Sequence, residues 1–169
     1  MAGQGNTRLM ERRPGGLPEG TRMAIVKTEW NASIVDELER GCLKTLAEHG
    51  LHDPVSIIVP GAVEIPFMVK SYWESVKYRD DKPSAFIALG CVIKGDTPHF
   101  EYVCQMASQG ILQLNLTLQV PTVFGVLTVL DEDQARQRIG GIHGHKGEEA
   151  ALTAISLVRA LSSTHRKVL

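Results

Sequence analysis

The sequence has almost no net charge, few cysteines and no long hydrophobic segment. Its 18 Lys and Arg residues nearly balance 19 Asp and Glu residues, which leaves a formal net charge of −1. Such a chain has no bulk electrostatic attraction to nucleic acid or to an anionic membrane, and we expect neither as a partner. No apolar run approaches the roughly 20 residues that span a bilayer. Residues 1–20 contain arginines but no hydrophobic stretch, so they do not resemble a secretory signal.

The three cysteines, Cys42, Cys91 and Cys104, are odd in number and lack the spacing of metal ligands. We therefore predict reduced thiols and a cytoplasmic location. Hydrophobic residues make up 43% of the chain and charged residues 22%, which is typical of a soluble globular protein. A chain of 169 residues is long enough for one domain with a sizeable core.

Apolar runs and segments of helical periodicity alternate along the chain. Residues 1–20, rich in glycine, proline and arginine, predict a flexible tail ahead of one domain over residues 21–169. Strands are predicted over residues 23–27, 55–59, 85–93 and 121–129. Helices are predicted over residues 34–46, after Glu64, and over 99–118, 133–138 and 148–161. The alternation predicts a flavodoxin-like, three-layer α/β domain with a four-stranded parallel sheet covered on both faces.

In such sheets, ligands bind beyond the carboxyl ends of the strands. The residues that follow each predicted strand are 29–31, 61–64, 94–99 and Thr128. Although these segments are far apart in the sequence, the fold predicts that they share one edge. Asn31 or Ser33 can cap the helix that follows the first strand, and Gly50 can end it.

The segment "KGDTPH" combines a cation, a cap candidate and a histidine after the third strand. Thr97 can cap a helix whose first turn begins at Pro98, and free backbone N–H groups there suit a phosphate or carboxylate. Lys94 can add positive charge, and His99 can transfer a proton near neutral pH. The alternative is that Thr97 and Pro98 only start a helix and that His99 is an ordinary polar side chain.

Four further residues each have a structural and a functional interpretation, and Phe124 has only a structural one. Glu64 favours a helix N-terminus, or it accepts hydrogen bonds from a polyhydroxy ligand. Trp30 is a core or interface anchor, or its ring stacks on a planar ligand. Phe124 is by default a core residue of the fourth strand. Arg138 and Lys146 are solvated surface residues beside a glycine-rich loop, or they complete an anion site.

Three other residues are predicted to have no chemical role. Cys91, near the end of a strand without a partner base, is expected to be a small buried hydrophobe. His143 and His145 alternate in the glycine-rich loop without a thiolate nearby, so we interpret them as solvated and expect no metal.

Together the motifs resemble the lumazine synthase family. The matching stretches are "WN" from Trp30, "PGAVEIP" from Pro60, "GCVIKGDTPHFEYV" from Gly90, "VPTVFGVLT" from Val120 and "QARQRIG…GHKGEEAA" from Gln134. They occur in family order and spacing from about Met23 to the C-terminus. The resemblance implies a transferase of riboflavin biosynthesis that needs no cofactor. It joins 5-amino-6-(D-ribitylamino)uracil to 3,4-dihydroxy-2-butanone 4-phosphate, and 6,7-dimethyl-8-ribityllumazine, phosphate and water are formed.

The resemblance also implies a role for each matching residue. Proton transfer is assigned to His99, with Lys146 near the phosphate and carbonyl. The pyrimidine is assigned to Trp30, Asn31, Cys91, Val92 and Ile93. The ribityl chain is assigned to Ala62, Val63 and Glu64. The phosphate is assigned to Arg138 and the backbone N–H groups of Asp96 and Thr97, and Phe124 is the aromatic supplied by an adjacent subunit.

The family forms pentamers, and some members assemble twelve of them into an icosahedral shell of sixty subunits. The resemblance therefore implies a homo-oligomer, and the compact loop over residues 139–146 favours the shell. Three alternatives remain: a flavodoxin-like binding module, an inactive shell-forming or flavin- or lumazine-binding protein of the same fold, and an activity like that of riboflavin synthase. The first leaves Trp30, Glu64, His99 and Arg138 without a shared task, and the second does not require His99 and Lys146.

Overall fold

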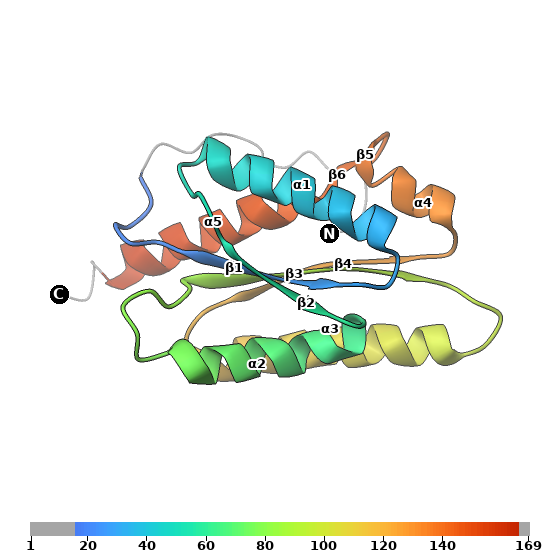
Figure 1. The fold of residues 1–169 in the computed structure, drawn as a ribbon, viewed down its shortest axis with the longest axis horizontal. Coiled ribbons are helices and arrows are strands. Elements are labelled where there is room, and N and C mark those ends of the chain that lie inside the picture. Colours follow the sequence, from blue (N-terminus) through green and yellow to red (C-terminus); the bar gives the residue numbers. More distant parts are fainter. Residues whose placement is uncertain (1–15, 166–169) are drawn as a thin grey trace.

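The computed structural model describes residues 16–165 as one α/β domain (Figure 1). The predicted tail over residues 1–20 falls mostly outside this range, and the boundary at residue 20 stays a prediction. The elements in chain order are β1 (Met23–Thr28), α1 (Ala32–Glu48), β2 (Val55–Val59), the short 3-10 helix η2 (Ala62–Glu64), α2 (Ile65–Val76), β3 (Ala85–Ile93), α3 (His99–Thr117), β4 (Thr122–Val129), α4 (Glu132–Arg136), β5 (Ile139–Gly141), β6 (Gly144–His145) and α5 (Lys146–His165).

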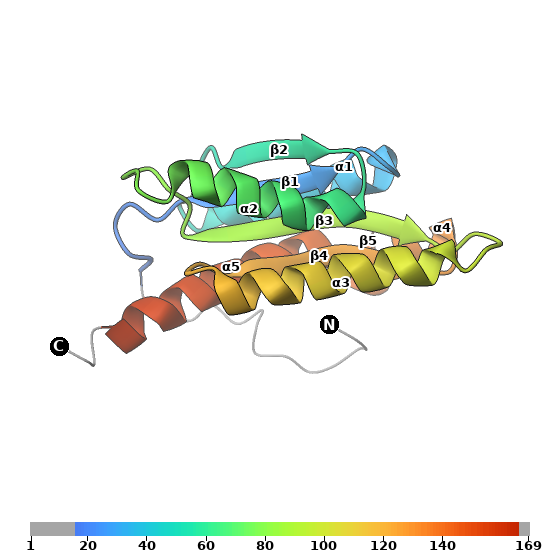
Figure 2. The same ribbon diagram turned by 90° about the horizontal axis from the view of Figure 1, so that it is seen from below.

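Four parallel strands form the main sheet in the order β2-β1-β3-β4. Figure 2 shows them side by side, with the loops after their carboxyl ends gathered at the edge near α4. In the sheet, Lys27 is opposite Ile58 of β2 and Leu89 of β3, and Ile93 is opposite Val129. The predicted four-stranded parallel sheet is thus confirmed, and so is the common edge of its loops.

Helices cover both faces of the sheet, as predicted (Figure 1). Ile25 and Ile87 point to one face and pack with the apolar sides of α1 and α5. Ala24 and Phe86 point to the other face and pack with α2 and α3. Because neighbouring residues of a strand point to opposite faces, only a continuous apolar run can serve a sheet that is buried on both sides. No helix within residues 16–165 is long and apolar enough to cross a membrane.

The C-terminal third differs from the prediction in three places. α4 begins at Glu132, one residue before the predicted start, because the side chain of Asp131 accepts the N–H of Gln134 at 2.7 Å and caps the helix there. Residues 139–146 are more than a glycine-rich loop, because β5 and β6 pair antiparallel there. α5 begins at Lys146, two residues before the predicted start.

Candidate active site at the carboxyl edge of the sheet

Asn31 fixes the loop between β1 and α1 to the end of β3. It precedes α1 with a left-handed backbone (φ 59°, ψ 41°) and makes no capping bond with its side chain. The Nδ2 amide instead donates a 2.9 Å hydrogen bond to the carbonyl oxygen of Cys91. Asparagine tolerates this backbone conformation better than most residues do. The position predicted for a helix cap therefore joins two strand ends.

Trp30, Gly61 and Glu64 lie together beside this connection. The backbone N–H of Trp30 donates to the carbonyl oxygen of Pro60 at 3.2 Å. A Cβ atom on Gly61 would lie 3.6 Å from Cδ1 of Trp30 and 3.0 Å from Oε2 of Glu64. The Trp30 side chain is 73% exposed, so it is not a core residue. Its ring is open to a planar ligand or to a neighbouring chain, with a carboxylate close by.

The segment between β3 and α3 is exposed from Lys94 to His99. The prediction that Thr97 caps α3 is wrong. Pro98 occupies the cap position with φ −62° and ψ −1°, the helix begins at His99, and no side chain caps it. Because Pro98 is itself almost helical, Thr97 stands one position too early to reach the free N–H groups of the first turn. His99 is exposed at the helix start, beyond the carboxyl end of β3.

Lys94 ties this segment to the neighbouring strand. Its backbone N–H donates to the carbonyl oxygen of Val129 at 2.9 Å. Its ammonium lies 3.5 Å from Oε1 of Glu101, and both side chains are about half exposed. Asp96 is exposed and makes no hydrogen bond or ion pair with any residue in 16–165. The segment therefore carries a side chain that attracts anions, Lys94, and one that repels them, Asp96, two residues apart.

Arg138 and Lys146 are neighbours at the base of the β5–β6 hairpin. The backbone N–H of Lys146 donates to the carbonyl oxygen of Arg138 at 2.8 Å. Nη1 of Arg138 donates to the carbonyl oxygen of Gln134 at 2.8 Å. Nζ of Lys146 donates to Oε1 of Glu149 at 2.6 Å, and both of these side chains are largely buried. The side chains of Arg138 and Lys146, eight residues apart in the sequence, thus extend from backbone positions that are hydrogen-bonded to each other.

The end of β3 offers an apolar surface. Cys91 is 4% exposed, whereas Val92 and Ile93 are half buried. Burial, with the negative charge of Glu132 as a lesser cause, raises the pKa of the Cys91 thiol to about 11. Since the thiolate is the nucleophile, Cys91 is unreactive near neutral pH. The prediction of a small buried hydrophobe is confirmed.

Phe124 does not reach this edge within one chain. It lies in the middle of β4, opposite Ala88 of β3, and is half buried against the core beneath α2 and α3. Ala62, by contrast, is buried within η2, and Val63 beside it is half buried next to the edge. Phe124 therefore lies in the core layer of its own chain, away from the end of β4 at Val129.

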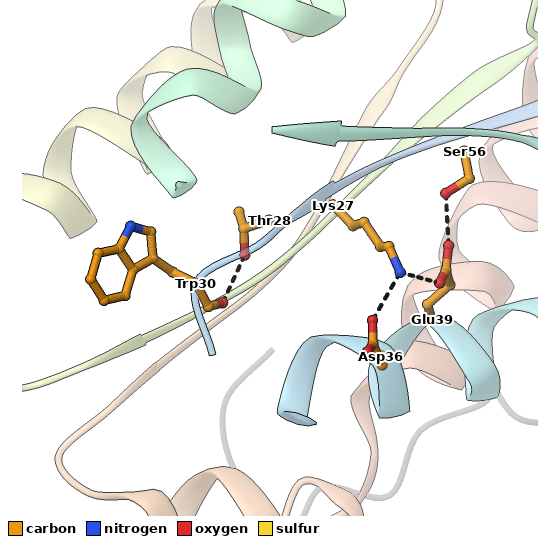
Figure 3. A network of polar contacts seen from close by, with 6 residues as sticks. All are labelled: Lys27, Thr28, Trp30, Asp36, Glu39 and Ser56. Carbon is orange, nitrogen blue, oxygen red and sulfur yellow. Dashed lines mark hydrogen bonds and ion pairs between the residues drawn. The ribbon is translucent and has the colours of Figure 1, made fainter. Parts of the chain in front are cut away.

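A charged network that the sequence did not predict joins β1, α1 and β2 (Figure 3). Nζ of Lys27 donates to Oε2 of Glu39 at 2.6 Å and to Oδ1 of Asp36 at 2.9 Å. Ser56 of β2 donates to the other oxygen of Glu39 at 2.7 Å. Burial alone lowers the pKa of the Lys27 ammonium, but the bonds to the two carboxylates outweigh it and raise the pKa above its usual value. Figure 3 shows the Trp30 indole directed away from this network.

A shallow pocket of about 580 Å³ lies at the opposite edge of the sheet, between Ser84, Val120 and Val158. It contains none of the predicted site residues. Its lining offers no histidine, arginine or aromatic side chain to a substrate. The chemistry of the described residues therefore concentrates at the carboxyl edge.

The described residues contain no group of three His, Cys, Asp or Glu side chains that could hold a metal ion. The prediction that His145 is solvated is wrong, because its Nδ1 atom is buried. The carboxyl edge instead combines an exposed indole, a carboxylate, an imidazole and a pair of cations on backbone that hydrogen bonds hold in place. Such a set can bind a flat polar molecule and an anion and can move protons between them.

Comparison with known proteins identifies close relatives. The family model described as 6,7-dimethyl-8-ribityllumazine synthase matches residues 20–162. The protein named 6,7-dimethyl-8-ribityllumazine synthase in Parabacteroides distasonis is 43% identical over 155 residues, which cover 89% of this chain and 93% of that protein. Proteins of the same name from Porphyromonas gingivalis and Bacteroides fragilis are 44% and 42% identical, and the matches cover 80% and 81% of this chain and 83% and 94% of the relatives.

Proposed function

The chain belongs to the 6,7-dimethyl-8-ribityllumazine synthase family, and we propose that its carboxyl sheet edge carries out the family's reaction. The protein is a transferase of riboflavin biosynthesis. It condenses 5-amino-6-(D-ribitylamino)uracil with 3,4-dihydroxy-2-butanone 4-phosphate to 6,7-dimethyl-8-ribityllumazine, phosphate and water. The observation that carries this location is the Asn31–Cys91 hydrogen bond, because it joins the loop of the exposed Trp30 to the apolar end of β3.

The aminouracil occupies the surface between β1, β3 and η2. The Trp30 ring stacks on the pyrimidine, which is supported by its 73% exposure. Asn31 and the backbone of Cys91, Val92 and Ile93 line the other side of the ring. The ribityl hydroxyls bind along η2, at Ala62, Val63 and Glu64. A carboxylate is suited to this task because it only accepts hydrogen bonds, and each sugar hydroxyl can donate one.

The phosphate of the second substrate binds between the β3–α3 segment and the hairpin. Backbone N–H groups of Asp96 and Thr97 face it, and Arg138 and Lys146 supply positive charge. Backbone amides near a helix start and charge-assisted bonds from a guanidinium are strong phosphate ligands. The exposed Asp96 carboxylate opposes this binding unless it turns to solvent. Lys146 also lies near the carbonyl that the amine attacks.

His99 moves the protons of the reaction. The amine of the aminouracil adds to the butanone carbonyl, and loss of water gives an imine. The phosphate then leaves, and the second amine closes the ring with loss of water. Each step moves a proton on or off nitrogen or oxygen, a task suited to an exposed imidazole at the start of α3. Holding the two substrates together supplies much of the remaining acceleration.

The site is completed by a second copy of the chain in a pentamer. Phe124, remote from the edge in its own chain, reaches the site of the adjacent subunit. The outer face of α3 supports an assembly, because Tyr102, Met106, Leu112 and Leu116 are 54–70% exposed there. Apolar side chains gathered on one helix face mark an interface more often than free surface. The compact hairpin over residues 139–146 favours packing of pentamers into an icosahedral shell, and sedimentation showing only pentamers at micromolar concentration would exclude the shell.

A cytoplasmic location fits the thiols of the chain. Cys42, Cys91 and Cys104 are all free, and the first two are buried. Proteins of oxidising compartments more often use such residues as disulfides.

The test is to mix the purified protein with both substrates and to follow lumazine absorbance and phosphate release together. Saturable formation of the two products in equal amounts supports the proposal. Trp30→Ala should raise KM for the aminouracil, whereas Arg138→Ala should raise KM for the butanone phosphate. A folded protein that gives no rate above the protein-free control would instead indicate an inactive shell-forming or flavin-binding member of the family.

A further inference from the structure

His145 is half buried, and its ring lies between α1 and the β5–β6 hairpin. A Cβ atom on Gly41 of α1 would lie 2.5 Å from Nδ1 and 2.6 Å from Nε2 of His145, and closer still to Cε1. On the hairpin side, a Cβ atom on Gly140 would lie 3.8 Å from Cδ2 of the ring. Figure 1 shows β5 and β6 next to α1. The imidazole therefore fills a space that exists only because position 41 has no side chain.

His145 is not held there by polar contacts. Its Nδ1 atom is buried and has no hydrogen-bond partner among residues 16–165. A buried nitrogen without a partner is unfavourable, so packing of the ring on Gly41 has to compensate for it. The contact depends on van der Waals packing alone, and a single methyl group added at position 41 would disturb it.

The backbone of His145 is directly connected to the proposed phosphate-binding cations. In the hairpin His145 is opposite Ile139, which follows Arg138, and His145 itself precedes Lys146. The N–H of Lys146 donates to the carbonyl oxygen of Arg138 at 2.8 Å. The His145 ring thus belongs to the residue that lies between the backbone positions from which both cations extend.

The docking of α5 itself does not depend on this ring. A Cβ atom on Gly147 would lie 2.8 Å from the carbonyl carbon of Leu38, and closer still to its oxygen. The first turn of α5 is therefore already in backbone contact with α1. Lys44 and Glu148 add an ion pair of 3.2 Å between the same helices. The His145–Gly41 contact adds a separate constraint on the hairpin alone.

We infer that His145, packed on Gly41, is a positioning residue that places Arg138 and Lys146 for phosphate binding. This inference rests on the proposed role of those two cations. Arginine and lysine bind phosphate through short charge-assisted bonds, which tolerate little displacement. A misplacement of about 1 Å can cost about 100-fold in rate. The contact therefore acts on the phosphate substrate and leaves the aminouracil, bound to other elements, almost unaffected.

Gly41→Ala is the sharpest perturbation. Alanine favours a helix more than glycine does, so helix propensity cannot explain a loss of function in this variant. We expect the inhibition constant of inorganic phosphate and KM for the butanone phosphate to rise about tenfold or more. KM for the aminouracil should stay within about twofold. Arg40→Ala is the matched control, because Arg40 is exposed beside Gly41 and should leave all these constants unchanged.

His145→Ala and the double variant complete the experiment. His145→Ala removes the ring without adding a clash, so it should also weaken phosphate inhibition in a protein that keeps its fold. In Gly41→Ala/His145→Ala the new methyl group has room, and phosphate inhibition should recover most of the loss seen in Gly41→Ala alone. Thermal unfolding and circular dichroism of each variant confirm the fold.

Two results would overturn the inference: normal phosphate inhibition in folded Gly41→Ala or His145→Ala, or a double variant as impaired as Gly41→Ala. Arg138→Ala, measured in parallel, separates this failure from failure of the proposed function. If phosphate inhibition is unchanged in Arg138→Ala, the proposed phosphate site is wrong. If it weakens in Arg138→Ala but not in Gly41→Ala, only the positioning role is wrong.

Discussion

Replacing Asn31 tests whether the loop of Trp30 is held by one side chain and one unusual backbone conformation. The side chain donates a 2.9 Å hydrogen bond to Cys91, and the backbone has φ 59°. Asn31→Gly removes the hydrogen bond but keeps the conformation accessible. Asn31→Ala removes the bond and adds the steric cost of a Cβ atom in the left-handed region.

The two contributions have separable magnitudes. A hydrogen bond of this kind contributes about 1 kcal/mol to the free energy of unfolding. The left-handed conformation costs an alanine about 1 kcal/mol more than it costs asparagine or glycine. We therefore expect a destabilisation of about 1 kcal/mol for Asn31→Gly and about 2 kcal/mol for Asn31→Ala. Both variants should also raise KM for the aminouracil several-fold, because Trp30 loses its connection to β3.

Urea unfolding of the wild type and the variants at one protein concentration measures these differences. Ser33→Ala is the control, because Ser33 is exposed on the first turn of the same helix and should change stability by less than about 0.5 kcal/mol. Equal stability of Asn31→Gly and Asn31→Ala would refute the backbone argument. Wild-type stability and wild-type KM in both variants would refute the role of the hydrogen bond.

Three further predictions concern other residues. Lys27→Met leaves the Glu39 carboxylate, 15% exposed, without its cation, and should lower the free energy of unfolding by about 2 kcal/mol in urea. The pKa of Lys27 is raised above 10.5, so the stabilisation by its ion pairs disappears only as pH rises through that raised value. The destabilisation by Lys27→Met should therefore be the same at every pH between about 6 and 9, and a destabilisation that varies there would contradict the pairing. His99→Ala should lower kcat by about 100-fold to 10,000-fold with both KM values nearly unchanged, and wild-type turnover would remove His99 from the mechanism. With pKa values of about 11 and about 12, Cys91 and Cys42 should resist iodoacetamide at pH 8 in the native protein and react once urea unfolds it; rapid native labelling detected by mass would show that they are accessible thiolates.

The sheet was predictable because its signal is local. The runs "VSIIV" and "AFIALGCVI" are continuous and apolar, and β2 and β3 have the predicted bounds. A strand buried on both faces can hardly have another sequence pattern. The edge residues followed from the strands, since parallel strands end together. Topology thus predicts the edge position of Trp30, Asn31 and Glu64, whereas their roles in binding come from the family resemblance.

Contacts between distant side chains left no such signal. Thr97 was expected to cap α3, but the near-helical backbone of Pro98 moves the cap one residue along. His145 was expected in solvent, and only the bare backbone of Gly41, 104 residues earlier, makes its burial possible. The Lys27 network likewise needs α1 and β2 both to be placed next to Lys27 of β1. Periodicity describes one element at a time, so it predicts none of these pairs.

The packing of α1 against α5 has a consequence for how the protein is made. The ribosome releases the first strand and helix long before the last helix, and the phosphate-binding cations emerge near the end of synthesis. Until then the sheet face that packs on α1 and α5 is covered by α1 alone, and part of the apolar surface of β3 stays exposed. Pairing between segments so far apart in the chain is slow, and exposed strands favour aggregation during the wait. Substrate binding is therefore a property only of the nearly finished chain, and ligand added during synthesis can stabilise the protein only at the last stage of folding.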